Sequence, residues 1–394
     1  MAQSSASIEF RKMDHEDRLR WLGEKVVDTA DVQRVITLCK RLWRQAGAKA
    51  EGNCMFVTGD TGAGKSTAVA AFADEMFAEL KAKRPESAWD RPRVVNSRIR
   101  PIWEVVPGKG HQCRLGVVVV NAKPTFKSLL RGTARALGIK LPSRFDFEEA
   151  EEKINAQIEK QGVKMIVFDE VQHIQKAAID KYSAADVIKM MVKSRLQVVC
   201  VGLPDALDLL LIATKDSKGF QGNDQLRRLV QKKAQVRPLP CSLDDFPPPG
   251  HSTSSASIHI ADTPFRRFCL ALDNRKISEA IILPFDESSK ISDPQTAIRL
   301  WRAFRGYVGK MMEFLFAATD LAIEKRLSRL NLKVMAATYR EMVECPDKDN
   351  WFMMDIADVH RRFHEKDGDE KKSEPDGTGE KKGGRRDNPL QHKH

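Results

Sequence analysis

The sequence predicts an α/β fold with a parallel-sheet core, N-terminal helices before it and a small all-helical domain after it. Short apolar runs rich in β-branched residues alternate with helical stretches over the first 240 residues. A glycine-rich loop joins the first of these runs to a helix, and only helical periodicity follows residue 263. Apolar runs that alternate with helices are typical of strands buried on both faces of a parallel sheet.

The chain begins with a polar segment, residues 1–13, that we expect to be disordered. Residues 14–50 are predicted to form N-terminal helices, because apolar residues recur at helical spacing from Asp14 to Trp43. The pattern breaks near Asp28 and Thr29, which indicates two helices rather than one.

Residues 51–240 are predicted to form the α/β core. Between its first helix and second strand, residues 81–115 are basic and punctuated by prolines, which indicates a surface insertion or a hairpin. The expected strands are Cys54–Thr58, Gly116–Asn121, Met165–Phe168, Val198–Gly202 and about Ala234–Leu239, and the expected helices are about Ala68–Leu80, Phe126–Leu137 and Phe147–Lys160.

The remainder of the chain divides into three parts. Residues 241–263 are rich in proline and serine and predict a loop between domains. Residues 264–345 predict a helical lid, with helices at about 264–274, 294–304, 308–325 and 328–343. Residues 346–394 are expected to be a tail, disordered from about residue 364, where charges and glycines dominate.

Composition limits the classes of function. No apolar run approaches the roughly 18–20 residues that cross a bilayer, so we expect a cytoplasmic protein without a membrane partner. Seven cysteines without a C-x-x-C pair favour neither a disulfide framework nor a zinc site. The net charge of +12 indicates a polyanionic partner, most commonly nucleic acid, and the sparse aromatic residues (7%) favour backbone contacts over base stacking.

The loop after the first apolar run has the pattern G-x-x-x-x-G-K-[ST]. In such a loop, backbone N–H groups and a helix N-terminus surround phosphate groups. Lys65 would reach the β- and γ-phosphates of ATP, and the Ser66 hydroxyl would bind Mg²⁺. The predicted nucleotide-binding residues are Gly59, Asp60, Thr61, Gly62, Ala63, Gly64, Lys65, Ser66 and Thr67.

A pair of carboxylates follows the strand at Met165–Phe168. Asp169 would hold Mg²⁺ through water, and Glu170 would act as the general base on the attacking water. The next strand ends in Gly202-Leu203-Pro204-Asp205, without an asparagine or threonine that could bridge the γ-phosphate and water. We therefore assign no residue to that bridging role.

Two further groups of basic residues are candidates for the same chemistry. Arg227 or Arg228, before the last strand, would project into a neighbouring subunit's nucleotide and stabilise transition-state charge. A solvated helix face explains both arginines equally simply. Lys310, in Gly306-Tyr307-Val308-Gly309-Lys310, would lean over the phosphates or remain a surface lysine.

These motifs together resemble the TniB/TnsC group of AAA+ transposition ATPases. The resemblance spans about residues 14–345, and Gly306-Tyr307-Val308-Gly309 with the helix after it is its more specific part. It implies a P-loop AAA+ core and a homo-oligomer, ring or filament, on double-stranded DNA. The implied partners are an integrase-type transposase and a target-selection adaptor protein. Lys123, Lys127 and basic residues of 91–109 would meet DNA phosphates, although a solvated surface explains each of them equally well.

Other functions share these motifs. A P-loop ATPase that loads or remodels proteins in DNA replication or phage biology is the main alternative. A binding module that uses ATP as a slow switch is a second one, consistent with the missing polar residue after Gly202. A small-molecule kinase is disfavoured, because no acceptor-binding motif is present.

Overall fold

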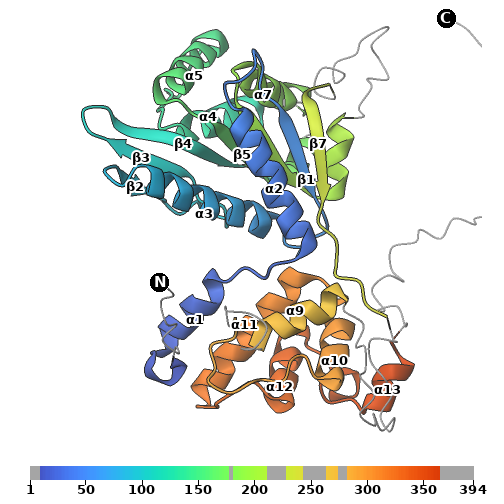
Figure 1. Cartoon of the computed structure of the whole chain (residues 1–394). Helices are drawn as coiled ribbons and strands as arrows, with labels where there is room; N and C mark the ends of the chain where they lie inside the picture. Colours follow the sequence, from blue (N-terminus) through green and yellow to red (C-terminus); the bar gives the residue numbers. More distant parts are fainter. Residues whose placement is uncertain (1–8, 177–180, 211–227, 243–262, 274–281, 364–394) are drawn as a thin grey trace, which may run out of the picture.

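The computed structural model describes residues 9–176, 181–210, 228–242, 263–273 and 282–363. In this part of the chain, a seven-stranded sheet with helices on both faces lies against a helical domain (Figure 1). The strand order is β2-β3-β4-β5-β6-β1-β7. Neighbouring strands from β4 to β7 run parallel, and β2 and β3 add antiparallel strands at one edge.

The parallel strands largely follow the sequence prediction. Two of them differ from it. The strand predicted at 116–121 begins six residues earlier, because its first half pairs with β3 in a hairpin. The last strand was predicted at 234–239 and lies at 230–235. As an edge strand it alternates exposed polar residues with partly buried ones, so it lacks a continuous apolar run. The strands are β1 (Cys54–Thr58), β4 (Gly110–Val119), β5 (Met165–Asp169), β6 (Gln197–Gly202) and β7 (Val230–Gln235).

Residues 81–115, which the sequence predicts to be a surface insertion or a hairpin, contain both features. Strands β2 (Ala88–Asp90) and β3 (Ile102–Val106) extend the sheet, and β3 turns directly into β4. Residues 91–101 form a loop between them. Within that loop Arg91 is paired with Asp74 and donates to the Pro101 and Arg100 carbonyl oxygens, so its charge is used inside the fold.

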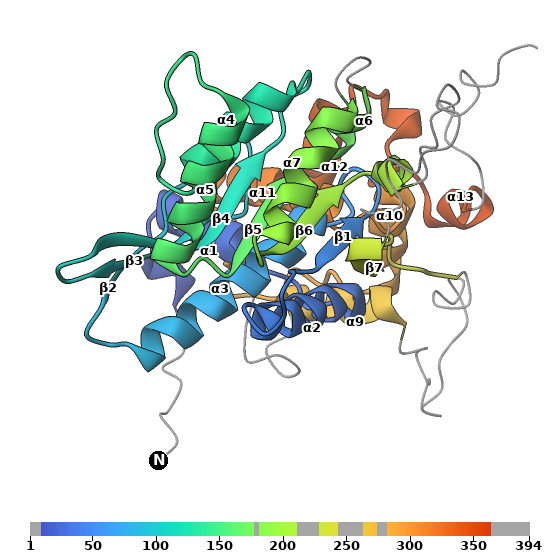
Figure 2. The same cartoon turned by 90° about the horizontal axis from the view of Figure 1, so that it is seen from above.

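Helices cover the two faces of the sheet in separate layers (Figure 2). Inward-pointing side chains alternate along each strand: Met55 and Val57 pack with α2 and α3, whereas Cys54 and Phe56 pack with the opposite layer. One layer contains α2 (Ala30–Gln45) and α3 (Lys65–Lys83). The other contains α4 (Phe126–Ala136), α5 (Phe147–Gln161), α6 (Gln172–Lys176) and α7 (Lys181–Lys193). A 3₁₀ segment, Pro204–Leu210, follows β6.

The lid forms at the predicted place, and more of the chain belongs to it. Residues 346–363, assigned to the tail from the sequence, pack into the lid: Trp351, Phe352 and Phe363 are buried, and the Phe352 ring stacks on Phe314 with centroids 5.0 Å apart. The lid helices are α9 (Pro264–Asp273), α10 (Pro294–Phe304), α11 (Val308–Glu324), α12 (Leu332–Val343) and α13 (Ile356–Arg361), with a 3₁₀ turn at Asp347–Asp349. Most of the 241–263 loop and the tail from 364 lie outside the described residues.

The two predicted N-terminal helices form, but they join different domains. Helix α1 (His15–Glu24) packs on the lid, with His15 Nε2 2.6 Å from Asp320 Oδ1 and Leu22 in the lid core. Helix α2 packs on the sheet. Residues 25–29 therefore cross from one domain to the other. Phe10, in the segment expected to be disordered, is buried against Trp21 within a 3₁₀ turn, Phe10–Lys12. Residues 1–8 lie outside the described range.

Among the helices that the structure describes, none combines the length and apolar character needed to cross a bilayer.

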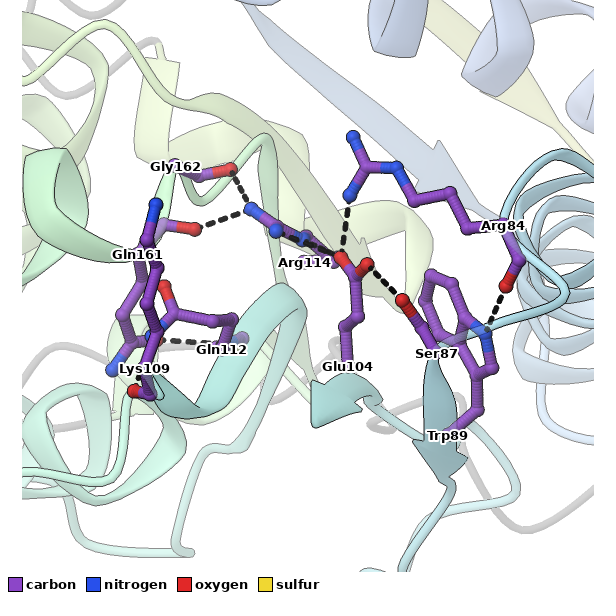
Figure 3. A network of polar contacts seen from close by, with 10 residues as sticks. Arg84, Ser87, Trp89, Glu104, Lys109, Gln112, Arg114, Gln161 and Gly162 are labelled. Carbon is purple, nitrogen blue, oxygen red and sulfur yellow. Dashed lines mark hydrogen bonds and ion pairs between the residues drawn. The ribbon is translucent and has the colours of Figure 1, made fainter. Parts of the chain in front are cut away.

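A buried carboxylate holds the antiparallel edge of the sheet to α3 (Figure 3). Glu104, on β3, is 1% exposed and accepts hydrogen bonds from Arg84 Nη1 (2.6 Å), Arg114 Nε (2.8 Å) and Ser87 Oγ (2.9 Å). Burial by itself would raise the pKa of Glu104, but the hydrogen bonds from these three side chains outweigh it and lower the pKa below its ordinary value. The network therefore stabilises the ionised form.

Replacing Glu104 with Gln is expected to lower the free energy of unfolding by about 2–3 kcal/mol, because the Arg114 charge loses its buried partner while Arg84 can rehydrate. Since the folded pKa is lowered, the stabilisation is present above the unfolded pKa and is lost as the pH falls through the folded value. Urea denaturation should show the full difference above about pH 5 and a smaller one under more acidic conditions. Glu86→Gln, an exposed control, should change the free energy by less than about 0.5 kcal/mol at any pH.

Candidate nucleotide-binding site

The glycine-rich loop connects β1 to α3 at the carboxyl edge of the sheet. Gly64, the residue before α3, has φ 103°, a left-handed conformation that favours glycine. The turn leaves the first N–H groups of α3 directed into the loop, where no carbonyl of the helix can accept from them. Such a cradle fits phosphate groups, which bring negative charge to a helix N-terminus.

Lys65 lies inside this loop. Its Nζ donates to the Asp60 carbonyl oxygen at 2.9 Å, a bond that phosphate oxygens could replace. Burial lowers the pKa of Lys65, and Glu170, Asp169 and Asp60 counteract part of that effect. The ammonium group is thus close to the carboxylates that the sequence assigned to the same site.

Asp169 ends β5 beside the loop. It is 2% exposed, and Ser66 Oγ donates to its Oδ1 at 3.2 Å. Burial raises the pKa of Asp169, and hydrogen bonds from Ser97 and Ser66 offset part of the rise. A hydroxyl and a carboxylate at this distance are the ligand types that Mg²⁺ accepts, directly or through water.

Ser97 is a part of the site that the sequence reasoning missed. Its Oγ donates to Asp169 Oδ2 at 2.8 Å from the loop between β2 and β3. The neighbouring Arg98 donates to the Gly23 carbonyl oxygen at 2.8 Å. A serine in an irregular basic segment carries no local signal, so only the antiparallel edge of the sheet could bring it here.

Glu170 follows Asp169 and faces the cavity. Its φ of 64° is left-handed, which turns the chain sharply from β5 toward α6. The Oε2 atom accepts a hydrogen bond from the Gln172 amide. The structure therefore brings Lys65, Ser66, Asp169 and Glu170 to one edge of the sheet, as the motifs predicted.

The lid contacts the loop through the start of α11. Gly309 N donates to the Gly62 carbonyl oxygen at 2.7 Å, and Tyr307 Oη donates to Asp60 Oδ2 at 2.9 Å. A Cβ atom at Gly309 would lie 2.7 Å from Gly62 O, so only glycine permits this approach. Lys310 lies beside Gly62, with its Nζ 4.9 Å from the centroid of the Tyr307 ring.

A cavity of about 450 Å³ lies between these elements. Residues of α1, the crossing segment, α2 and α11 line it, most of them apolar, and Lys25, Arg237 and Glu313 are among its charged residues. The glycine-rich loop and Glu170 line it as well. This combination suits a nucleotide, whose phosphates would lie in the loop and whose base would contact apolar side chains. Its apolar lining includes Leu22, Val27, Val32, Met312 and Phe316, and its loop lining includes Thr61, Gly62, Ala63, Gly64, Lys65, Ser66 and Thr67.

The structure describes one of the two candidate arginines, and it lies away from this cavity. Arg228 is exposed and precedes β7. Because β7 runs parallel to β1, the amino end of β7 lies at the edge of the sheet opposite the glycine-rich loop. Arg228 is thus remote from the loop of its own chain. Arg227 lies outside the described residues.

Comparisons with known proteins agree with this architecture. Residues 48–210 match the family model of the AAA domain. The ORC1 protein of Aeropyrum pernix in complex with DNA is 13% identical, over 82% of this chain and 69% of that one, with a TM-score of 0.51. The ADP form of the Aeropyrum pernix ORC2 protein is 10% identical, over 82% of this chain and 72% of that one, with a TM-score of 0.51. No curated protein sequence matches the chain.

Residues 48–210 therefore match an AAA domain, and the chain has the AAA+ fold, as the sequence resemblance implied. The match to the AAA domain supports ATP binding and hydrolysis in general terms. The narrower TniB/TnsC assignment remains a matter of sequence resemblance.

Replacing Lys65 with Ala is expected to weaken ATP binding about 10- to 150-fold, because a charge-assisted hydrogen bond of about 1.5–3 kcal/mol is lost. Titration with a fluorescent ATP analogue would measure this. Lys81→Ala, an exposed lysine near the other end of α3, is the matched control and should bind ATP normally. Equal affinity in both variants would contradict the assignment of the loop.

Proposed function

We propose that this chain is an ATP-dependent, DNA-binding regulator of transposition. In this proposal it assembles as a homo-oligomer on double-stranded target DNA and recruits or activates an integrase-type transposase, with a target-selection adaptor as a further partner. The observation that carries the ATPase part is the meeting of Lys65, Ser66, Asp169 and Glu170 at one edge of the sheet.

Each of these side chains has a defined task in ATP hydrolysis. Lys65 would hold the β- and γ-phosphates, and Ser66 with Asp169 would hold Mg²⁺, which neutralises phosphate charge when it is bound. Glu170 would orient the attacking water and accept its proton. The carboxylate faces the cavity from beside the loop, which is the position that this role requires.

Exposed basic side chains at the same edge of the sheet support DNA binding. Arg93 and Arg100 lie in the loop between β2 and β3, and Lys123 and Lys127 follow β4. Arg93 lines a groove of about 720 Å³ together with Asn121, two residues before Lys123. Because Ser97 of the same loop contacts Asp169, a nucleotide that changed the Asp169 contacts could change the position of these cations. The fold likeness to the ORC1 protein in complex with DNA is consistent with this role.

Two DNA-linked functions fit this site. The transposition role rests on the sequence resemblance, above all on Gly306-Tyr307-Val308-Gly309, whose glycines contact the core. The alternative, a loader or remodeller in DNA replication, is favoured by the fold likeness to ORC proteins. Stimulation of strand transfer by an integrase-type transposase would support the first, and ATP-dependent deposition of a replicative helicase would support the second.

DNA binding is expected to depend on ATP and to be insensitive to sequence. Glu170→Gln should keep ATP bound, because an amide cannot accept the proton of water, and should therefore form long-lived complexes with duplex DNA. In that background, Arg93→Ala with Lys123→Ala should weaken binding at least tenfold at about 0.1 M salt and reduce the slope of log affinity against log salt by about two.

The matched control is Lys333→Ala with Lys348→Ala, which removes two exposed lysines from the lid. Fluorescence anisotropy on two unrelated duplexes should show affinity and slope unchanged in this control. An equal loss in both double variants would mean that net charge, and not this edge of the sheet, determines binding.

Catalysis between subunits is expected to need Arg228 or Arg227. Replacing both with Ala should preserve ATP binding but remove DNA-stimulated hydrolysis, because their charges would act on a neighbour's phosphates. Mixing this variant with Lys65→Ala should restore part of the activity, since mixed interfaces pair an intact loop with intact arginines. An inactive mixture of variants that still assemble on DNA would contradict this role.

A further inference from the structure

The end of β6 has no polar side chain of its own, yet a polar group occupies the space beside it. Gln172 is the first residue of α6, is 4% exposed, and lines the nucleotide cavity together with Glu170 and Leu203. Its Nε2 donates to Glu170 Oε2, and its Oε1 accepts from Leu203 N at 3.2 Å. One side chain thus connects the proposed base to the backbone after β6.

The orientation of this amide is determined by its partners. A backbone N–H can only donate, so Gln172 presents its oxygen to Leu203. An ionised carboxylate can only accept, so Gln172 presents its nitrogen to Glu170. Both bonds are satisfied at once in one orientation of the amide and neither in the flipped one.

The surrounding backbone is shaped around this contact. A Cβ atom at Gly202 would lie 2.8 Å from Gln172 Oε1 and 2.9 Å from Val171 Cγ2, so a larger residue there would displace the amide. Val171 N also donates to the Val201 carbonyl oxygen at 3.0 Å, which joins the ends of β5 and β6. Gly202 therefore provides the space that Gln172 occupies.

We propose that Gln172 is a positioning residue for Glu170 and connects it to the backbone at the end of β6. This inference rests on the proposed function, in which Glu170 is the base for ATP hydrolysis. The bond from Nε2 restrains the position of Glu170 Oε2 beside the cavity. The bond to Leu203 N ties that orientation to the end of β6. A base held in one orientation loses less entropy on reaching the transition state than a free one.

Two substitutions separate the two bonds. Gln172→Leu removes both while keeping a similar volume. Gln172→Glu can still accept from Leu203 N but cannot donate to Glu170. Gln197→Leu is the matched control, because Gln197 is also buried and accepts from the backbone of Asn53, at the other end of β6. It tests the cost of losing a buried glutamine at the far end of β6, away from Leu203.

The expected result is a fall in kcat of at least tenfold in Gln172→Leu and Gln172→Glu, with the dissociation constant for ATP within threefold of wild type. Gln197→Leu should keep kcat within twofold at a temperature where it is folded. In a Glu170→Gln background, Gln172→Leu should cause no further fall in kcat, because its effect passes through Glu170.

A second readout needs no nucleotide. Amide hydrogen exchange in peptides covering residues 198–207 should be faster in Gln172→Leu, which frees Leu203 N, and close to wild type in Gln172→Glu. Gln197→Leu should leave exchange after Gly202 unchanged. One contrary outcome is faster exchange in Gln172→Leu together with a kcat no lower than that of Gln197→Leu. That result would show that Gln172 has only a structural role, in connecting α6 to the end of β6.

Two further outcomes would overturn the inference. A fall in kcat that adds to that of Glu170→Gln would show that Gln172 acts independently of the base. Unchanged exchange in Gln172→Leu would show that the bond to Leu203 is absent. Failure of the proposed function is distinguishable from both, since Glu170→Gln by itself would then hydrolyse ATP at the wild-type rate.

Discussion

The parallel pairing of β5, β6 and β1 is the constraint on which the nucleotide site depends. Parallel neighbours end at the same edge of a sheet, so the loop after β1 meets the carboxylates at the end of β5, although 103 residues separate Ser66 from Asp169. The same edge receives the end of β6, where Gln172 connects Leu203 to Glu170. Because side chains alternate between faces with a period of two, a register shift of one residue would turn these groups away.

A second property of the site is that both domains build it. The lid reaches the loop through Gly309 and Tyr307, and α1 belongs to the lid although it precedes the sheet in the chain. Residues 25–29 cross between the domains and line the cavity together with α11. A ligand in this cavity contacts sheet and lid at once, so its affinity depends on how the two are placed. In the proposed function, this coupling is the physical basis on which ATP would control assembly on DNA.

Local sequence patterns were sufficient to predict much of the fold and of the candidate site. The glycine-rich loop, Asp169 and Glu170 are contiguous signals whose chemistry can be recognised without knowing the fold, and the structure brings them together. The predicted position of the edge strand β7 is four residues too late in the chain, because an edge strand with alternating polar residues lacks a continuous apolar run. The sequence assigns residues 346–363 to a tail because they contain only a few aromatic residues and no long helical pattern. Those aromatic residues are buried only by contact with Phe314 and its neighbours in the lid, which the sequence does not show.

The sequence by itself determined the AAA+ fold, its parallel core strands and the candidate phosphate-binding and acidic residues. Short-range spacing along the chain encodes these features, so they can be recognised without knowledge of the tertiary contacts. Only the tertiary structure decided that Ser97 contacts Asp169, that α1 covers the nucleotide cavity, and that Gln172 fills the space beside Gly202. Each of these contacts joins segments from different elements of the fold, and which residues meet depends on strand order and packing rather than on any local pattern.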